Sequence, residues 1–439
     1  MNRRDALRLL AGTTAASMVT GPPSVLAQHR ARRRTSPVSA KPVLTAKEEA
    51  FLDEMQRRGC LYFLEQADPD SGQVQDRARA DTPDGLLDAR RLSSIAATGF
   101  GLTALCIAHR RGYAPADVLE TRVEKTLAFH AHKLKHEHGF FCHFNDVRTG
   151  TPFPHVEYSS IDTSLLLCGV LTARAYFHAN ATIVRDATLL YERVDWPWML
   201  YENTNLFCMG WKRDSGFLQA VWNHYCELMM IPLLAMGSPT HPVTPAVWSA
   251  WSRPVMEYKG YRYIAARDPL FVHQYSHAWF DFRGKHDGFA DYFQNSVTAT
   301  EAHRQFCLDQ GAPYGPQYWG VSASDSQHGY RAWGGPPSFG GVDGTVVPCA
   351  AAGSLPFLPG ACLQTLQGLH ARYAEQAWGR YGFCDALHPE AVWYDPDVLG
   401  IDLGIGVVMA ENLRTGFVWE VFARNPEVGR AMRLAGFPA

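Results

Sequence analysis

SLLLCGVLTARAYF (residues 164–177) and YCELMMIPLLAMG (residues 225–237) are two runs that are apolar on nearly every face of a helix. A helix of this composition has to be covered by other elements on all sides. The inner helices of a ring of helical hairpins meet this condition, because they face both the outer helices and the barrel axis. Both runs therefore predict inner helices of a closed helical architecture.

The hydrophobic periodicity predicts further helices along most of the chain. The expected helices span residues 46–66, 92–112, 116–136, 160–178, 183–192, 215–235, 244–256, 288–309, 357–375 and 400–423. These helices form pairs, and the connections along the chain alternate between short turns and long loops rich in glycine, proline and aromatic residues. Few strands are expected. The pattern predicts an all-α protein, an (α/α)6 barrel of six hairpins whose long loops gather at one mouth.

The first residues read as an export signal followed by a tail. Arg3 and Arg4 precede a weakly apolar run, and a small-x-small cleavage site ends at Ala27. The paired arginines match a twin-arginine address, and the run is too short to span a bilayer. We expect a signal peptide over 1–27, a flexible tail over 28–44, a single catalytic barrel over 45–439, and a periplasmic or secreted protein with no membrane attachment after cleavage.

The charge and cysteine content exclude several classes of partner. There are 41 Lys and Arg against 43 Asp and Glu, a net charge of -2, so the sequence offers no basic stripe for nucleic acid or anionic lipid. The ten cysteines contain no C-x-x-C pair and mostly lie in apolar helical runs, which predicts free buried thiols. Free thiols fit the export of an already folded chain, and the alternative is that one or two disulfide bonds form after export.

No metal site or cofactor is expected. Five histidines fall close together in HAHKLKHEHGFFCHF, namely His130, His132, His136, His138 and His143. His130 and His132 would point in different directions on a helix, and the H-E-x-x-H spacing is absent. We interpret the run as a solvated helix end. A serine hydrolase is equally unsupported, because G-x-S-x-G is absent.

Aromatic residues in the loops indicate a carbohydrate ligand. The chain has 12 Trp, 18 Tyr and 23 Phe, and many lie in loops such as PYGPQYWG. Carboxylates stand beside them at Glu157-Tyr158, Asp195-Trp196 and Trp393-Tyr394-Asp395. Aromatic rings bind the apolar faces of sugars while carboxylates bind their hydroxyl groups. The loops therefore predict a glycan cleft at the mouth of the barrel.

Eight long runs resemble the bacterial glucoamylase-like family, in family order over nearly the whole mature chain. They are SSIAATGFGLTAL (93–105), GFFCHFND (139–146), VEYSSIDTSLLLCGVLTAR (156–174), WNHYCELMMIPLLAMGSPTHP (222–242), HQYSHAWFDFRG (273–284), DYFQNSVTATEAHRQFC (291–307), YWGVSASDSQHGYRAWGGPP (318–337) and LGIDLGIGVVMAENLRTGFVW (399–419). The resemblance implies an exported six-hairpin barrel related to β-1,2-glucan hydrolases and to the transglycosylating module of cyclic β-1,2-glucan synthases. The sequence departs from the usual pattern at Cys226 and at Leu403-Gly404-Ile405, which bears on linkage and chain-length preference.

Three carboxyls are candidates for catalysis, since glycoside hydrolysis needs one protonated acid and one carboxylate. Glu227 lies in an apolar run, where burial favours the protonated acid; the alternative is a structural pair with His224. Asp402 is the preferred base, by analogy with inverting six-hairpin barrels. Asp162 begins another apolar helix and either caps that helix or contributes as base.

The remaining candidates are expected to bind substrate. Each has an alternative in packing, exposure or a turn, and Glu411 in particular is an alternative member of a buried polar cluster with Asn412 and Arg414. The substrate-binding candidates are Glu157, Tyr158, Gln274, His277, Trp279, Asp281, Arg283, Trp319, Asp325, Tyr330, Arg331, Trp333, Trp393 and Glu411.

The residues predict a glycoside hydrolase without a cofactor, and the resemblance implies that it cleaves a β-1,2-linked glucan with inversion. The alternatives are a transglycosylase on the same glucan, a glycosidase of another linkage, and a glycan-binding protein without activity. A uronate lyase is disfavoured, because its cleft would offer clustered Arg and Lys where these loops offer carboxylates.

Overall fold

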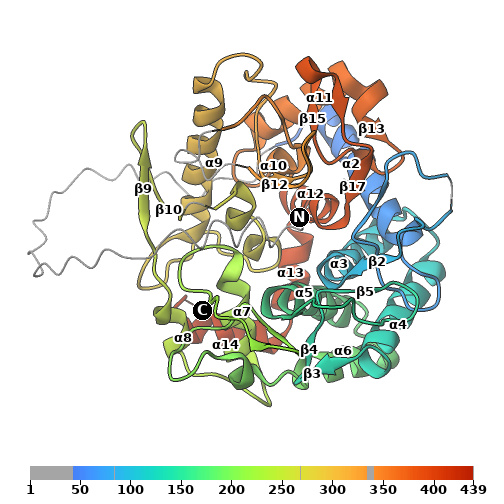
Figure 1. Ribbon diagram of the computed structural model, residues 1–439, viewed down its shortest axis with the longest axis vertical. Helices are drawn as coiled ribbons and strands as arrows, with labels where there is room; N and C mark the ends of the chain where they lie inside the picture. Colours follow the sequence, from blue (N-terminus) through green and yellow to red (C-terminus); the bar gives the residue numbers. More distant parts are fainter. Residues whose placement is uncertain (1–42, 84, 267, 334–340, 439) are drawn as a thin grey trace, which may run out of the picture.

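The computed structural model describes residues 43–83, 85–266, 268–333 and 341–438, and Figure 1 shows its helices gathered into a closed ring. The α-helices are α2 (Ala46–Glu65), α3 (Ile95–Arg111), α4 (Ala116–His132), α5 (Ser160–Tyr176), α6 (Ala181–Glu192), α7 (Met230–Gly237), α8 (Ala246–Ala250), α9 (Tyr292–Asp309), α10 (Pro348–Ala352), α11 (Pro359–Ala377), α12 (Gly400–Arg414), α13 (Phe417–Ala423) and α14 (Pro426–Leu434). The 3-10 helices are η1 (Trp196–Met199), η2 (Glu227–Met229), η3 (Leu270–His273), η4 (Ser276–Ala278) and η5 (Pro389–Ala391).

The inner wall of the ring consists of α3, α5, α7 with η2, the η3–η4 segment, α10 and α12. Contacts run from α12 to α3, from α3 to α5, from α5 to α7, and from α10 back to α12. The η3–η4 segment contacts η2 on one side, and Gln274 Nε2 donates to the carbonyl of Ala350 in α10 on the other. The wall therefore closes on itself among the described residues.

The outer helices cover this wall. Helix α2 packs on α3 and α12, α4 on α3, α6 on α5, α9 on η3 and α11 on α10, while α13 and α14 close the far end against α5 and α7. Figure 1 shows α3, α5, α10 and α12 near the centre, with α4, α6, α9 and α11 toward the rim. The prediction of an all-α barrel is confirmed.

The close approach of α3 and α5 explains why the inner helices carry glycine. A Cβ atom at Gly99 would lie 2.2 Å from the carbonyl oxygen of Leu165, and one at Gly169 would lie 2.0 Å from the carbonyl oxygen of Gly99. The two backbones are thus in direct contact, which only glycine permits. Every residue of α5 from Ser160 to Ala173 is buried, as the apolar run predicts.

Short strands of two to four residues lie between the helices. Three of them run directly into inner helices, β2 (Leu92–Ser94) into α3, β6 (Tyr158–Ser159) into α5 and β17 (Asp397–Leu399) into α12. Strand β1 pairs antiparallel with β17, β2 with β5, and β6 with β7, which also pairs with β8. The other strands are β1 (Arg77–Arg79), β3 (His136–Glu137), β4 (Phe140–Phe141), β5 (Phe144–Asp146), β7 (Gly210–Lys212), β8 (Gly216–Phe217), β9 (Val255–Tyr258), β10 (Tyr261–Ile264), β11 (Ala323–Ser324), β12 (Arg331–Ala332), β13 (Trp378–Gly379), β14 (Gly382–Phe383), β15 (Leu387–His388) and β16 (Trp393–Tyr394).

Three predicted helices differ from the structure. The run 215–235 is helical only from Glu227, because the hairpin of β7 and β8 turns at Gly216, where φ is 78°. The run 400–423 is divided into α12 and α13 at Gly416, where φ is 74°. The helix expected over 244–256 is reduced to α8, and the following residues 255–264 form the hairpin of β9 and β10.

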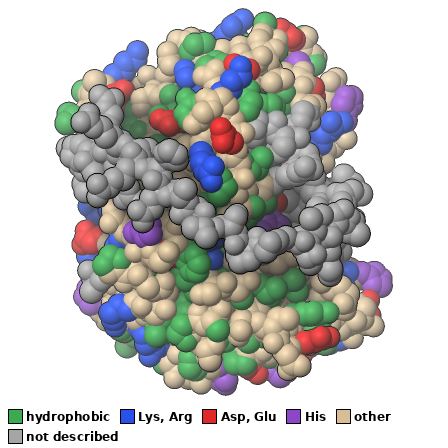
Figure 2. All heavy atoms as spheres, turned by 90° about the vertical axis from the view of Figure 1, so that its left-hand side faces the viewer, with side chains coloured by type: hydrophobic (Ala, Val, Ile, Leu, Met, Phe, Trp, Pro, Cys, Tyr) green, Lys and Arg blue, Asp and Glu red, His purple; other side chains and the backbone are tan. Residues whose placement is uncertain are grey.

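The surface and the cysteines match the composition. All ten cysteines are buried and free of disulfides, as predicted. Figure 2 shows a face on which acidic and basic side chains are interspersed among uncharged ones. The predicted signal peptide and nearly all of the predicted tail lie outside the described residues, within which no helix is long and apolar enough to cross a bilayer.

Candidate active site

A cleft of about 590 Å³ opens where the first turns of α3, α5 and α12 meet the short strands. Five carboxyls, one guanidinium, one imidazole and three aromatic rings line it among the described residues. The lining residues are Asp76, Arg77, Leu92, Ser94, Ala96, His143, Phe144, Asp162, Asp325, Ser326, Gly329, Tyr330, Trp393, Asp395, Pro396, Asp397, Leu399 and Ile401. Carboxyls beside aromatic rings can bind sugar hydroxyls and sugar faces together.

Asp162 and Asp402 occupy the same position on two inner helices. Each is the third residue of its helix, α5 or α12, and α3 packs between these helices. The Asp162 backbone N–H donates to Ser159 Oγ over 3.1 Å, and Ser159 Oγ donates to the Asp162 carboxylate over 2.5 Å. Unpaired amides at a helix start stabilise negative charge. The helix starts therefore suit both side chains to the ionised form.

His143 connects two of the predicted carboxyls. Its Nδ1 lies 3.5 Å from Glu157 Oε1 and its Nε2 lies 3.5 Å from Asp162 Oδ1, while its ring stacks on Phe144 with the centroids 3.7 Å apart. The His143 carbonyl also accepts from the backbone N–H of Ile95, the first residue of α3. We interpreted this histidine as part of a solvated helix end, whereas it lies buried between β4 and β5 in the wall of the cleft.

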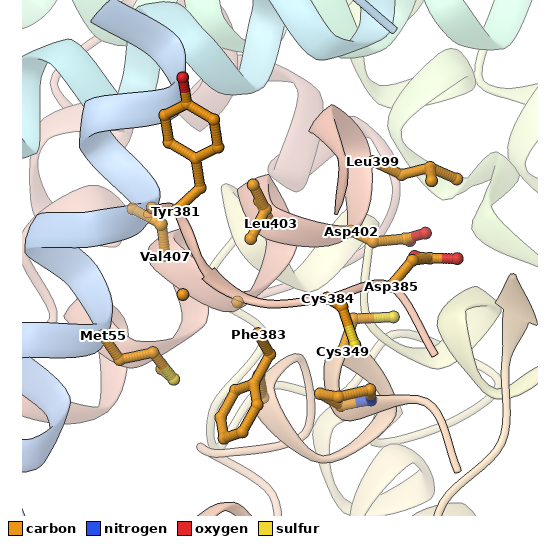
Figure 3. A pocket seen from close by; sticks show the side chains of 15 residues that line it. Met55, Cys349, Tyr381, Phe383, Cys384, Asp385, Leu399, Asp402, Leu403 and Val407 are labelled. Carbon is orange, nitrogen blue, oxygen red and sulfur yellow. The ribbon is translucent and has the colours of Figure 1, made fainter. Parts of the chain in front are cut away.

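A smaller cavity of about 40 Å³ lies beneath the cleft, and Leu399 lines both spaces. Figure 3 shows the carboxyl groups of Asp402 and Asp385 side by side at its edge. Asp385 Oδ2 accepts from the backbone N–H of Asp325 over 2.8 Å. Burial, followed by the neighbouring charge of Asp402, raises the pKa of Asp385 well above its ordinary value. Asp402 therefore belongs to a carboxyl pair rather than standing alone.

The rim of the cleft is an ionic network. Arg77 Nη1 lies 2.5 Å from Asp325 Oδ2, and Arg90 Nη1 lies 2.5 Å from Asp397 Oδ2. Asp325, Asp395 and Asp397 each place a carboxylate oxygen within 4.8 Å of the others. Burial raises the pKa of Asp395 to about 7. The two guanidiniums thus compensate only part of the negative charge at the rim.

Glu227 also begins an inner helix, because it opens η2 and η2 leads into α7. Its side chain is buried, and it is not among the residues lining the two cavities. Ser276 Oγ donates to the Glu227 carbonyl over 2.8 Å, and the neighbouring Tyr275 hydroxyl lies 3.5 Å from Asp402 Oδ1. The segment at 275–276 therefore ties Glu227 and Asp402 to one element. His224, the alternative partner of Glu227, lies 3.1 Å from Asp268; the hydrogen bond to Asp268 and, to a smaller extent, the charge of Glu227 raise the pKa of His224.

The predicted binding residues divide into two groups. Asp325, Tyr330 and Trp393 line the cleft, and Glu157 reaches it through His143. Arg331 is exposed beside the buried Trp333, with its guanidinium 5.1 Å from the ring centroid. These residues come from three separate parts of the chain.

The second group lies away from the lining of the cleft, and most of its members are buried in the core. Gln274 Nε2 donates to Ala350 and Ser354, Trp279 Nε1 donates to Thr103 Oγ1, and the His277 carbonyl accepts from Trp419. These contacts join inner elements of the barrel, so the expectation of a subsite wall at 273–284 is replaced by a structural role. Trp319 and Tyr158 are likewise buried, and Asp281 and Arg283 pair with each other over 2.8 Å.

Glu411 is a structural residue rather than a ligand of the substrate. It is fully buried, and its carboxylate lies 2.8 Å from Arg111 Nη2 and accepts from Gln56 Nε2 and Thr415 Oγ1. It stands nine residues after Asp402 on α12, which separates the two by about 13 Å along the axis. The alternative of a buried polar cluster at the end of the last hairpin is therefore the observed one.

Several residues of the site were not predicted from the sequence, among them Asp76, Arg77, His143, Asp385 and Asp397, while Asp395 was recognised only as a carboxylate beside aromatic residues. Most lie in short strands or loops, where no helical period marks a side as facing inward. The one available signal is the density of aspartate in WYDPDVLGID, residues 393–402, immediately before an apolar helix.

Residues 219–426 match the model of a family described as "Putative glucoamylase". An exo beta-1,2-glucooligosaccharide sophorohydrolase (non-reducing end) from Parabacteroides distasonis is 27% identical over 429 residues, covering 88% of this chain. The chain spans only 58% of the length of that relative.

Solved structures reproduce the barrel over nearly the whole described chain. An endo-beta-1,2-glucanase from Chitinophaga pinensis, in complex with sophorotriose and glucose, superposes with a TM-score of 0.83 at 26% identity, covering 90% of this chain and 99% of that one. A structure described as a putative glucoamylase from Bacteroides fragilis gives a TM-score of 0.81 at 29% identity, covering 91% and 99%. The matched family model covers just under half of this chain, and the solved structures show that the chain is similar to glucoamylase-like proteins over nearly its whole described length.

Proposed function

We propose that this chain is an exported glycoside hydrolase that cleaves β-1,2-linked glucan. The observation that carries the proposal is the cleft, where Asp162, Asp325 and Asp395 face Trp393 and Tyr330. Two of the relatives named above, the sophorohydrolase from Parabacteroides distasonis and the endo-beta-1,2-glucanase from Chitinophaga pinensis, act on β-1,2-linked glucan or its oligosaccharides, and the second holds sophorotriose. The excess of carboxyls over guanidiniums in the lining suits a neutral sugar better than a uronate.

Glu227 is assigned the role of general acid, and Asp402 or Asp162 the role of general base. The acid protonates the glycosidic oxygen as the bond to the anomeric carbon breaks, while the base accepts a proton from the water that attacks that carbon. Asp162 and Asp402 stand at helix starts that favour the carboxylate, as a base requires. In this scheme the water attacks from the opposite face, and the configuration inverts.

The test incubates the purified chain with β-1,2-, β-1,3-, β-1,4- and α-1,4-glucans and with polygalacturonate, and follows new reducing ends. We expect release from β-1,2-glucan, a loss of roughly 100-fold or more in Glu227→Gln because the acid cannot donate, and an inverted first anomer by proton NMR. Glu420→Gln is the matched control, since Glu420 is exposed and pairs with Arg424 on the outer helix α13.

Other outcomes would redirect the assignment. Larger products without net reducing ends would indicate transglycosylation, in which a sugar hydroxyl replaces water. Binding of glucan without turnover would indicate a glycan-binding protein, and cleavage of polygalacturonate would contradict the proposal. Full activity in Glu227→Gln would remove Glu227 from the role of acid.

We also propose that the protein works in the periplasm or outside the cell, after twin-arginine export. Arg3 and Arg4, the short apolar run and the cleavage site at Ala27 support this location. The free buried cysteines are compatible with folding before export.

A further inference from the structure

The proposed mechanism gives no task to the buried carboxyl of Asp385, which lies beside the proposed base Asp402. Its backbone N–H donates to the Asp397 carbonyl over 3.0 Å, and its Oδ2 accepts from the Asp325 N–H over 2.8 Å. Figure 3 shows its carboxyl beside that of Asp402. Two buried carboxyls in contact resist ionising together, because the charge of each one disfavours the charge of the other. The pair therefore holds at least one proton.

The surroundings decide which member carries that proton. Asp385 faces Asp402 on α12, Asp395 before β17, Asp325 after β11 and the guanidinium of Arg77 on β1. The Cys384 thiol precedes it in the chain, and the Tyr275 hydroxyl lies on the other side of Asp402. Three carboxyls against one guanidinium, in a side chain that is 4% exposed, oppose a negative charge on Asp385.

Asp402 is buried as well, but its position on a helix differs from that of Asp385. It stands in the first turn of α12, where the free amides favour an anion, and the Tyr275 hydroxyl points at its Oδ1. Two carboxyls in contact titrate as one unit, and the proton resides on the member whose charge is less well compensated. In this pair that member is Asp385.

We propose that Asp385 is a protonated positioning residue that donates its O–H to Asp402 and thereby holds Asp402 as an oriented carboxylate. The inference rests on the proposed function, in which Asp402 serves as the base. When the base acts, an O–H bond of the attacking water breaks, its proton passes to Asp402, and its oxygen bonds to the anomeric carbon. The leaving oxygen takes the proton of the acid, and Asp385 keeps its own proton throughout.

Two substitutions separate this role from a merely structural one. Asp385→Asn keeps the geometry, because an amide N–H can donate to Asp402 while the amide oxygen accepts the Asp325 N–H. Asp385→Ala removes both. We expect Asp385→Asn to retain kcat within a few fold at the optimum and to lose the fall in rate that ionisation of Asp385 causes at high pH. Asp385→Ala should lower kcat by about 10- to 100-fold with little change in KM, the range typical of lost supporting hydrogen bonds.

A spectroscopic measurement tests the proton without relying on turnover. The infrared difference between the wild type and Asp385→Asn near neutral pH should contain the carbonyl band of a hydrogen-bonded carboxylic acid, and Asp70→Asn, at an exposed position, should give no such band. Absence of the band, or an Asp385→Asn variant as inactive as Asp385→Ala, would overturn the proposal. If Asp385→Ala does not fold by circular dichroism, Asp385→Asn and the infrared band decide. A wild type silent on every glucan would refute the proposed function, whereas the band would still report on the pair.

Discussion

Asp395 shows how strongly the charge of a single residue in this cleft depends on its neighbours. Its side chain is 5% exposed, its Oδ1 accepts from the Asp397 N–H over 3.0 Å, and it lies beside the carboxylate of Asp325. Burial and this neighbour raise its pKa from an ordinary value near 3.8 to about 7. The folded protein therefore keeps a proton that the unfolded chain has already lost.

The first prediction follows from this difference. Between about pH 4 and pH 7 the folded state binds more protons than the unfolded state at Asp395, so this residue makes stability fall as pH rises, by at most about 1.4 kcal/mol per pH unit. Asp395→Asn keeps the hydrogen bond and removes the ionisation. The difference between its free energy of unfolding and that of the wild type should therefore grow in favour of the variant as pH rises through that window, and should stay constant above it. Urea unfolding at several pH values measures this effect.

The control is Asp70→Asn, which changes an exposed aspartate of a loop. Its stability curve should run parallel to that of the wild type. A parallel curve for Asp395→Asn as well would contradict the assignment of a raised pKa to Asp395.

The sequence pattern identified the carboxyls at the helix starts but only some of those in the loops. Asp162, Asp402 and Glu227 each interrupt or precede an apolar run, where a charged side chain is conspicuous. Asp385 and His143 stand in short strands and turns, and only the folded chain brings them against Asp402 and Asp162. A one-dimensional pattern contains no information on such pairings.

At the scale of elements, the barrel depends on backbone contact between α3 and α5. Gly99 and Gly169 face each other so closely that a methyl group at either position would meet backbone atoms rather than a flexible side chain. The first turns of these helices then fall side by side, which places Ser94 and Asp162 in the same cleft. The helix contact is therefore a condition of the site as well as of the fold.

The second prediction concerns this contact. Gly99→Ala should lower the free energy of unfolding by about 1–3 kcal/mol, because overpacking against backbone outweighs the gain of about 1 kcal/mol in helix propensity. Gly360→Ala is the matched control in α11, where a Cβ atom meets nothing within 4 Å and the helix gain alone applies. Denaturant unfolding compares the two variants, and equal stabilities would show that α3 and α5 separate without cost.

Periodicity predicted the long helices well and the irregular inner segment poorly. Helices α2, α4, α6, α9 and α11 start and end within a few residues of the expected bounds, because each shows one apolar face. The run 270–278 forms 3-10 turns in the inner wall, where Gln274 and Ser276 hold neighbouring backbones. Its polar residues resemble a binding motif in sequence, but in the fold they form hydrogen bonds with buried backbone carbonyls.

At the scale of the whole molecule, the buried thiols and the expected export route belong together. All ten cysteines lie in the interior without a disulfide, so the fold needs no oxidant to form. A chain that folds in a reducing compartment suits a pathway that transports folded proteins. On this expected route, the barrel folds before the protein is transported.

The third prediction tests this route. Replacement of Arg3 and Arg4 by Lys should leave the precursor in the cytoplasm, because the paired arginines are the address that the pathway reads. Immunoblots of cytoplasmic and periplasmic fractions measure the distribution. Replacement of Arg32 and Arg33 by Lys is the control and should leave export unchanged; export of the Arg3 and Arg4 variant at the normal level would exclude the twin-arginine route.

The carboxyls at the starts of inner helices have an evolutionary consequence. Asp162, Asp402 and Glu227 are anchored by the ring itself, whereas the rim of the cleft is drawn from strands and loops. Insertions or deletions in those loops can lengthen, shorten or block the cleft while the proposed catalytic carboxyls stay where the ring holds them. Proteins that share this barrel can therefore differ between endo- and exo-cleavage through changes in their loops, while the carboxyls at the helix starts keep the same positions.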